Sequence, residues 1–298
     1  EGEKTVEPGI GQVVLTLGDG ESMPLKRDTN RLIFGGTMLQ VRNERGTLVY
    51  SKIKSKEASE KIVYNTLTVP VRERFQLVLA DGTKVFLNSG SEMRYPERFG
   101  KARREVFLKG EAWFEVAKDS AREFWVHAGA MDVKVLGTSF NVKAYERLET
   151  VATTLVEGSV EVACAGKSFQ IVPGEQFVYD KNNRVMDVRM VDTESYVSWK
   201  DGYYKFRQTT LEEIMETLSV WYGLNVFYVN ESAKQVEFTG KVKRYEDARM
   251  LLDKFEQTGD VVFDIKGNNV FITIKQKKPF AREWNSFLVK ARGMVWQS

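Results

Sequence analysis

The sequence predicts a mainly β protein, in which an all-β region of short strands is followed by a small α+β domain. Residues 104–145 divide into short runs of alternating apolar and polar residues, with Gly129 and Gly137 between runs. This pattern is typical of closely spaced, half-buried strands. A strand-turn-strand pattern occurs twice, as TLGDGESMPL and VLADGTKVFL. After Trp199 the apolar residues change to helical spacing, which indicates the α+β domain.

Residues 1–65 are predicted to form β hairpins that join the main β domain. Residues 12–17 alternate and lead through a Gly-Asp-Gly turn into a second strand, which is a hairpin signature. Another hairpin is expected around residues 43–46. The charged stretch 52–61 is expected to be an exposed loop.

Residues 66–187 are predicted to form the main β domain, either a sandwich or a short β-helix of glycine-punctuated strands. Alternation over residues 110–116 places Ala112, Phe114 and Val116 on one face of a strand. The other face then carries Glu111, Trp113 and Glu115. Glycines at 110, 137 and 158 predict bulges or close backbone approaches.

Residues 188–200 are a predicted linker, and residues 201–275 a small α+β domain of order βαββαββ, with two helices on a sheet. The first helix is expected to begin after Thr210, because Thr210 and Glu213 can form a capping box. It is expected to end at Gly223. The second helix is expected at residues 245–257, and a hairpin closes the domain.

The tail, residues 276–298, is predicted to be basic and amphipathic, with an apolar stripe that appears if it is helical. It could dock on the body of the protein, on a partner or on a membrane surface. Docking on protein is the favoured interpretation. An added or altered terminus is the alternative.

Composition and charge exclude several classes of protein. The 298 residues are 42% hydrophobic and 29% charged, which is typical of an ordered globular chain. A net charge of +3 gives no indication of nucleic-acid binding. No run approaches the roughly 18 apolar residues of a membrane span, and the first residues lack the apolar core of a signal peptide. The single cysteine, Cys164, is expected to be a small buried residue.

Candidate catalytic groups do not converge in the sequence. Glu111 and Glu115 share a strand face, but about 3.3 Å per residue separates them by about 13 Å, beyond the roughly 9.5 Å limit of a glycosidase pair. We therefore expect both to be solvated. His127 is the only histidine, so a histidine triad or zinc site has no support. Phosphate-binding glycine motifs are absent from the sequence. We predict no enzyme activity, no cofactor and no metal.

Five segments in order carry a resemblance to a known family: LVLADGTKVFLNSGSEMRYPERF, REVFLKGEAWFEVAKD, VHAGAMDVKVLGTSFNVKAY, TTLVEGSVEV and VPGEQFVYD. They resemble the FecR family of periplasmic anti-sigma regulators, particularly its Bacteroidetes branch, and the resemblance implies that the main β domain is of FecR type. The segment WKDGYYKFRQTTLEEIMETLSVWYGLNVFY resembles the C-terminal domain of that branch. This domain is similar to the short signalling domain of secretins and TonB-dependent transporters.

The resemblance implies a signal relay without catalysis. Such proteins combine a cytoplasmic segment that binds an extracytoplasmic-function sigma factor, one inner-membrane helix, and a periplasmic region. The periplasmic region senses the substrate-loaded state of an outer-membrane TonB-dependent transporter. The sigma-binding segment and the membrane helix are absent from this sequence, so we expect a periplasmic fragment of a single-pass membrane protein.

The predicted partner site is the first strand of the α+β domain. Its residues are Tyr203, Tyr204, Lys205, Phe206 and Arg207. If this strand has a free edge, it can accept a strand of the transporter's signalling domain through main-chain hydrogen bonds. The alternative is an internal strand.

The rival function is a glycan-binding or structural module of the cell envelope. It is indicated by aromatic residues on predicted strands, with Trp113 and Trp125 as the best candidates for stacking on sugars. Packing is the favoured role for both. A hydrolase is the weakest alternative.

Overall fold

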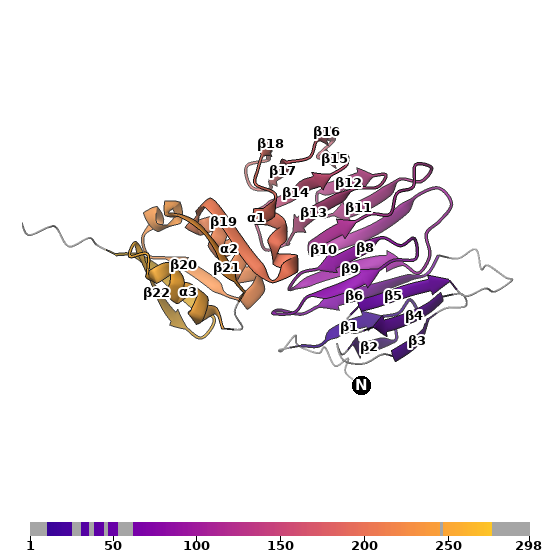
Figure 1. The fold of residues 1–298 in the computed structure, drawn as a ribbon, viewed down its shortest axis with the longest axis horizontal. Helices are drawn as coiled ribbons and strands as arrows, with labels where there is room; N and C mark the ends of the chain where they lie inside the picture. Colours follow the sequence, from indigo (N-terminus) through magenta and orange to yellow (C-terminus); the bar gives the residue numbers. More distant parts are fainter. Residues whose placement is uncertain are drawn as a thin grey trace, which may run out of the picture.

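The computed structural model describes residues 11–25, 31–35, 39–44, 47–52, 62–244 and 247–275. Figure 1 shows two parts, a large β-rich part and a smaller part that carries two longer helices. The predicted class, a mainly β protein that ends in a small α+β domain, is confirmed.

The β-rich part consists of two sheets that share one strand. Sheet A has the order β2 (Ser22–Leu25), β1 (Val13–Thr16), β6 (Tyr64–Val69), β9 (Ser91–Pro96), the first half of β10 (Arg104–Glu115), β11 (Phe124–Ala128), β12 (Met131–Val135), β15 (Val160–Cys164) and β16 (Lys167–Ile171). Sheet B has the order β3 (Arg31–Gly35), β4 (Leu39–Glu44), β5 (Thr47–Lys52), β7 (Phe75–Val78), β8 (Lys84–Leu87), the second half of β10, β13 (Ser139–Ala144), β14 (Thr150–Glu157), β17 (Glu175–Asp180) and β18 (Val185–Met190).

Strand β10 passes from sheet A to sheet B at Gly110. Its φ of 105° lies in the region that favours glycine. A Cβ at this position would lie 2.7 Å from Ser91 Cα, so the two backbones can approach only because the side chain is missing. Gly158 has a φ of 95° and approaches Thr138 in the same way. The predicted close backbone approaches are thus confirmed at both glycines.

The two sheets enclose one hydrophobic core, to which alternate residues of both contribute. Most neighbouring strands pair antiparallel, and in this part only β10–β11 and β5–β7 pair parallel among the described residues. Of the two predicted architectures, this pairing is that of a sandwich, because the coils of a β-helix stack their strands in parallel. The predicted hairpins β1–β2, β4–β5 and β7–β8 are confirmed.

The smaller part begins with short helical turns. Its elements are α1 (Glu194–Val197), η1 (Ser198–Asp201), β19 (Tyr203–Thr210), α2 (Leu211–Tyr222), β20 (Asn225–Tyr228), η2 (Glu231–Gln235), β21 (Glu237–Lys243), α3 (Ala248–Glu256), β22 (Val261–Lys266) and β23 (Asn269–Ile274). The predicted βαββαββ order is confirmed. The five strands form two small sheets, β19–β21 and β20–β23–β22, where one sheet was expected.

Local signals define α2 as predicted. The Thr210 hydroxyl accepts a hydrogen bond from the Glu213 amide at 3.3 Å, and Gly223 ends the helix with a φ of 68°. Apolar residues at helical spacing, among them Leu211, Ile214 and Leu218, are fully buried in a second core. Helix α3 begins after Asp247, whose side chain accepts from the Arg249 amide.

The second half of β10 is buried on both faces, where the sequence predicted a half-buried strand. Ala112 and Phe114 face the sandwich core, whereas Trp113 belongs to the core of the smaller part. The expectation of a solvated Glu111 is wrong, since only 8% of it is exposed. Glu115, with 39% of its side chain exposed, is solvated as expected. The reason is that the smaller part packs over this end of sheet B.

The predicted loop at 52–61 begins one residue too early, because Lys52 is the last residue of β5. Its other residues, 53–61, and the tail at 276–298 lie outside the described residues. None of the helices in the described residues has the length and apolar character that a membrane span requires.

Candidate functional site

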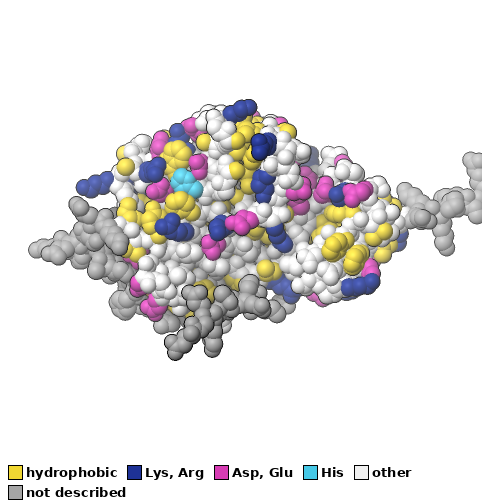
Figure 2. Space-filling view, turned by 180° about the vertical axis from the view of Figure 1, so that it is seen from behind, with side chains coloured by type: hydrophobic (Ala, Val, Ile, Leu, Met, Phe, Trp, Pro, Cys, Tyr) yellow, Lys and Arg dark blue, Asp and Glu magenta, His cyan; other side chains and the backbone are white. Residues whose placement is uncertain are grey.

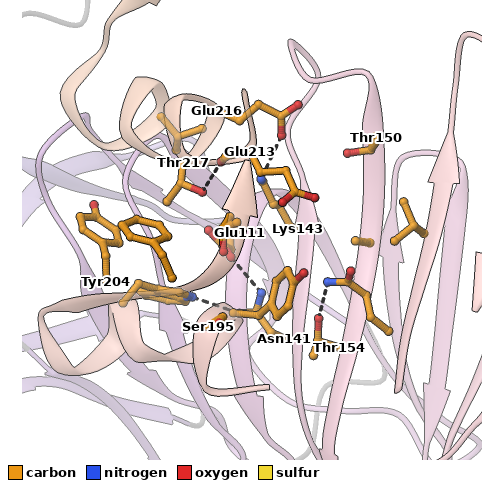
Figure 3. Close-up of a pocket in the computed structure, with 18 of the residues that line it drawn as sticks. Glu111, Asn141, Lys143, Thr150, Thr154, Ser195, Tyr204, Glu213, Glu216 and Thr217 are labelled. Carbon is orange, nitrogen blue, oxygen red and sulfur yellow. Dashed lines mark hydrogen bonds and ion pairs between the residues drawn. The ribbon is translucent and has the colours of Figure 1, made fainter. Parts of the chain in front are cut away.

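The candidate site is the junction where α1, η1, β19 and α2 pack on the outer face of sheet B. A cavity of about 180 Å³ lies between these elements. Figure 3 shows Glu111 and Asn141 at its centre, with Glu216, Glu213 and Lys143 toward one side and Tyr204 toward the other. The cavity walls therefore come from both parts of the protein.

A buried polar network centred on Glu111 occupies the floor of the junction. Asn88 Nδ2 donates to one Glu111 carboxylate oxygen and Asn141 Nδ2 to the other, each at 2.8 Å. Trp199 Nε1, from η1, donates to Asn141 Oδ1 at 3.3 Å. The pairing of β10 with β13 brings Glu111 and Asn141 close together. Glu111 lies opposite Lys143, and Asn141 lies two residues away along β13, opposite Trp113. The network thus joins the sandwich to the segment that follows it.

Burial raises the pKa of Glu111 above its usual 4.5, although the charge of Lys143 and the two amide donors partly oppose the rise. A raised folded-state pKa favours the protonated form. The stability from this group is therefore fully present below the unfolded pKa and is lost as pH rises through the folded pKa.

We expect wild type to lose stability relative to Glu111→Gln as pH rises from about 4.5 toward neutrality. The glutamine stays neutral, so only wild type pays for a buried charge. Urea unfolding of both proteins across this range measures the difference, and the acidic end, where both side chains are neutral, is the reference. A difference that stays constant with pH would contradict the assignment.

A second contact fixes the C-terminal end of α2 to the sandwich. The Ser89 hydroxyl donates to the Val220 carbonyl at 3.2 Å, and the Arg72 amide donates to the Trp221 carbonyl at 3.1 Å. The Tyr145 hydroxyl donates to the Ser89 carbonyl at 2.8 Å, which holds the turn between β8 and β9 in place. The sandwich thereby satisfies carbonyls that a free helix end leaves unpaired.

Two ion pairs join α2 to sheet B beside the cavity. Lys143 Nζ, on β13, lies 3.4 Å from Glu216, and Arg189, on β18, lies 3.7 Å from Glu213. In the expected capping box Glu213 would reach back to its own helix, so its side chain here faces the sandwich instead. These partly exposed pairs add specificity to the orientation more than stability.

The predicted partner residues lie on β19, which is a strand as expected and pairs with β21 alone among the described strands. Tyr204 and Phe206 are buried in the core of the smaller part. Tyr203 is 41% exposed, and Arg207 is also exposed. Lys205 forms ion pairs with Asp192, at 3.1 Å, and Glu194. Of the predicted set, Tyr203, Lys205 and Arg207 thus have side chains on the face of β19 that is turned away from this core.

The two aromatic candidates for sugar binding differ in their surroundings, since Trp113 lies inside the protein and Trp125 lies on the outer face of sheet A. Trp113 is buried. On the outer face of sheet A, His127 stacks between Phe107, at 4.9 Å, and Trp125, at 6.2 Å between ring centroids. Lys134 lies over the Trp125 ring. Figure 2 shows the histidine in cyan among hydrophobic and charged side chains. The stacked rings cover one another, so this row does not favour the glycan-binding alternative.

The remaining candidates for chemistry have structural surroundings. His127 Nδ1 lies 2.7 Å from Asp132, its cross-strand neighbour. Cys164 is buried as expected, and burial raises its thiol pKa. Within the described ranges, no group of three or more histidine, cysteine or acidic side chains is arranged to hold a metal ion.

Comparison with known families decides the relationship of the chain. A model of the FecR protein family matches residues 65–161, and a model of the FecR C-terminal domain matches residues 203–272. Together the matches cover more than half of the chain. The chain belongs to the FecR family of anti-sigma regulators. This family is a regulatory, non-enzymatic kind of protein.

Solved structures agree with the FecR assignment. The chain is 27% identical, with a TM-score of 0.65, to a crystal structure described as an anti-sigma factor from Parabacteroides distasonis ATCC 8503; the match covers 71% of this chain and 99% of that one. A second crystal structure with the same description has a TM-score of 0.64 at 27% identity, over 72% and 100% of the chains. No curated protein matches the chain significantly.

The junction lies between the two FecR matches and draws on both. Glu111 and Asn141 come from the FecR match, Glu216 and Val220 from the FecR C-terminal match, and Trp199 from the segment between them. Sequence reasoning missed this network, because Asn88, Glu111 and Trp199 are far apart in the chain. The one local signal was the tryptophan in a segment that was otherwise predicted to be a linker.

Proposed function

We propose that this FecR-family chain is the periplasmic part of an anti-sigma factor that senses the state of an outer-membrane TonB-dependent transporter. The relay continues across the inner membrane to an extracytoplasmic-function sigma factor, through a membrane helix and a cytoplasmic segment outside this sequence. The observation that supports this proposal is the succession of the FecR and FecR C-terminal matches in one chain.

The receiving surface in this proposal is the edge of β19 that does not pair with β21. Gly202 and Arg244 form a hydrogen-bonded pair, with the Arg244 amide 3.1 Å from the Gly202 carbonyl. Antiparallel strands alternate between bonded and non-bonded pairs. The main-chain groups of Tyr203 and Lys205 therefore point away from β21, toward an edge where a partner strand can add.

The same ribbon is basic. Lys243 lies opposite Tyr203, and Lys241 lies opposite Lys205, with Lys241 Nζ 4.9 Å from the centre of the Tyr203 ring. Lys241 and Lys243 are both exposed. A signalling domain with an acidic strand edge would be attracted to this surface and associate faster at low salt.

Transmission uses the junction. Lys205 forms ion pairs with Asp192 and Glu194 at the start of α1, the short helix that leads into η1 and Trp199. Through Trp199 the chain reaches Asn141 and Glu111 in the sandwich. A partner that moves β19 thus acts on side chains in contact with sheet B.

We expect the purified chain to bind the periplasmic signalling domain of its transporter, and Lys205→Pro to abolish that binding. Proline removes an outward main-chain donor without taking a bond from β21. Lys205→Ala loses the same ion pairs but keeps the amide, so it is the matched control. Isothermal titration calorimetry measures all three affinities. If wild type does not bind, the receptor role is contradicted; if Lys205→Pro binds as Lys205→Ala does, the partner uses another surface.

A further inference from the structure

The edge of sheet B at β18 is open. Strand β18 pairs with β17 on one side, and no described strand pairs with its other side. Figure 1 shows β18 at the upper rim of the β-rich part. Two of its apolar side chains are largely exposed, Val185 at 57% and Met190 at 71%. An open edge with exposed apolar side chains is a ready surface for pairing with another strand.

Main-chain geometry defines which residues face this open edge. The Val191 amide donates to the Gly174 carbonyl at 2.9 Å, so these two residues are a hydrogen-bonded pair. Because bonded and non-bonded pairs alternate in an antiparallel ladder, the even-numbered residues turn their amides and carbonyls outward. These residues are Met186, Val188 and Met190.

The sequence of this edge is symmetric about Val188. Residues 185–191 read Val-Met-Asp-Val-Arg-Met-Val, the same apolar pattern in both directions. An antiparallel copy centred on Val188 places valine opposite valine and methionine opposite methionine. It also places Asp187 opposite Arg189. The bonded pairs of such a ladder are the residues whose main-chain groups face outward, so the register satisfies the backbone.

The charges favour the same register. The side chain of Asp187 makes no hydrogen bond or ion pair within the described residues, while Arg189 contacts Gln176 at 3.2 Å and Glu213 at 3.7 Å. In the copy-to-copy ladder these two residues form a non-bonded pair, in which side chains are closest, and opposite charges there are favourable. The open edge at β16, with the sequence Lys-Ser-Phe-Gln-Ile, offers no such match.

We propose that two copies of this chain form a symmetric dimer by antiparallel pairing of β18 with β18, centred on Val188. The pairing joins sheet B of one copy to sheet B of the other. It places the partner's β18 against Val185 and Met190 and gives Asp187 a charged partner. The proposal does not depend on the sensing role proposed above.

Sedimentation velocity over a range of concentrations tests the dimer. Wild type is expected to shift from monomer to dimer as concentration rises, and Val188→Pro to remain a monomer. Proline at this position removes a donor that only the second copy uses and blocks the approach of its strand. Val188→Thr keeps the amide and the branched shape, and it is expected to dimerise. A wild type that stays monomeric at every concentration, or a dimeric Val188→Pro, would overturn the proposal.

A cysteine pair tests the register independently of the proline variant. In this ladder the two copies of residue 188 lie about 5.5 Å apart between Cα atoms, within the range that a disulfide spans. The two copies of residue 185 lie about 20 Å apart. Val188→Cys is therefore expected to form a disulfide-linked dimer under mild oxidation, and Val185→Cys is not. Equal cross-linking of both variants, or cross-linking of Val185→Cys alone, would contradict this register, as would a wild-type dimer whose Val188→Cys variant does not cross-link.

Discussion

Arg104→Ala is expected to lower the free energy of unfolding by about 3–5 kcal/mol, because it breaks a buried ion pair. Arg104 is fully buried, and its guanidinium lies 2.9 Å from the Asp81 carboxylate, which is also buried. It donates to the carbonyls of Ala117, at 2.8 Å, and Arg122, at 2.9 Å. One side chain thus connects the β7–β8 turn with the loop between β10 and β11. Without it, Asp81 keeps a buried charge, and the carbonyls of Ala117, Arg122 and Leu136 lose a donor.

The neighbouring Arg103→Ala is the matched control. Arg103 is 55% exposed and pairs with Glu105 at 3.0 Å, and an exposed pair of this kind contributes about 0–1 kcal/mol. Urea unfolding followed by circular dichroism measures both variants. If Arg104→Ala lowers the free energy of unfolding by no more than the about 0–1 kcal/mol expected of Arg103→Ala, the buried pair does not support the sandwich.

Trp199→Ala is expected to cost about 3–5 kcal/mol, since it empties a large buried site at the junction. Trp199 is 4% exposed and belongs to the core of the smaller part, and its indole also bonds to Asn141 in the sandwich. The substitution should therefore also loosen the attachment of the smaller part. Chemical unfolding gives the cost, and faster amide exchange in α2 would reveal the loosening.

Trp199→Phe separates packing from hydrogen bonding in this prediction. It keeps most of the buried ring but leaves Asn141 Oδ1 without its donor, which costs about 1 kcal/mol. If both variants lose the same stability, the hydrogen bond carries the effect. If neither loses stability, Trp199 does not connect the two parts.

Local features of the fold were predictable from the sequence because neighbouring residues determine them. The Gly-Asp-Gly turn after β1 and the capping residue Thr210 act within a few positions of the chain. Strand alternation likewise follows from adjacent side chains. The boundaries of α2 and the hairpins were predicted correctly for this reason, whereas α3 begins at Ala248 and not at residue 245 as predicted.

The junction could not be predicted in the same way. The pattern around Glu111 is that of a strand with one solvated face, and it is buried only because α2 and η1 pack there. The division of β19–β23 into two small sheets likewise depends on packing between distant elements. Alternation shows that a face is polar, but not what will cover it.

The central claim is that the smaller part receives a signal and passes it to the sandwich through the junction. Hydrogen exchange of this chain, alone and with the transporter's signalling domain, tests it most directly. The account predicts slower exchange in residues 203–207 on binding and altered exchange in residues 88–91 and 194–199. A complex whose exchange changes only at sandwich strands remote from the junction would contradict the account, as would a failure to form any complex.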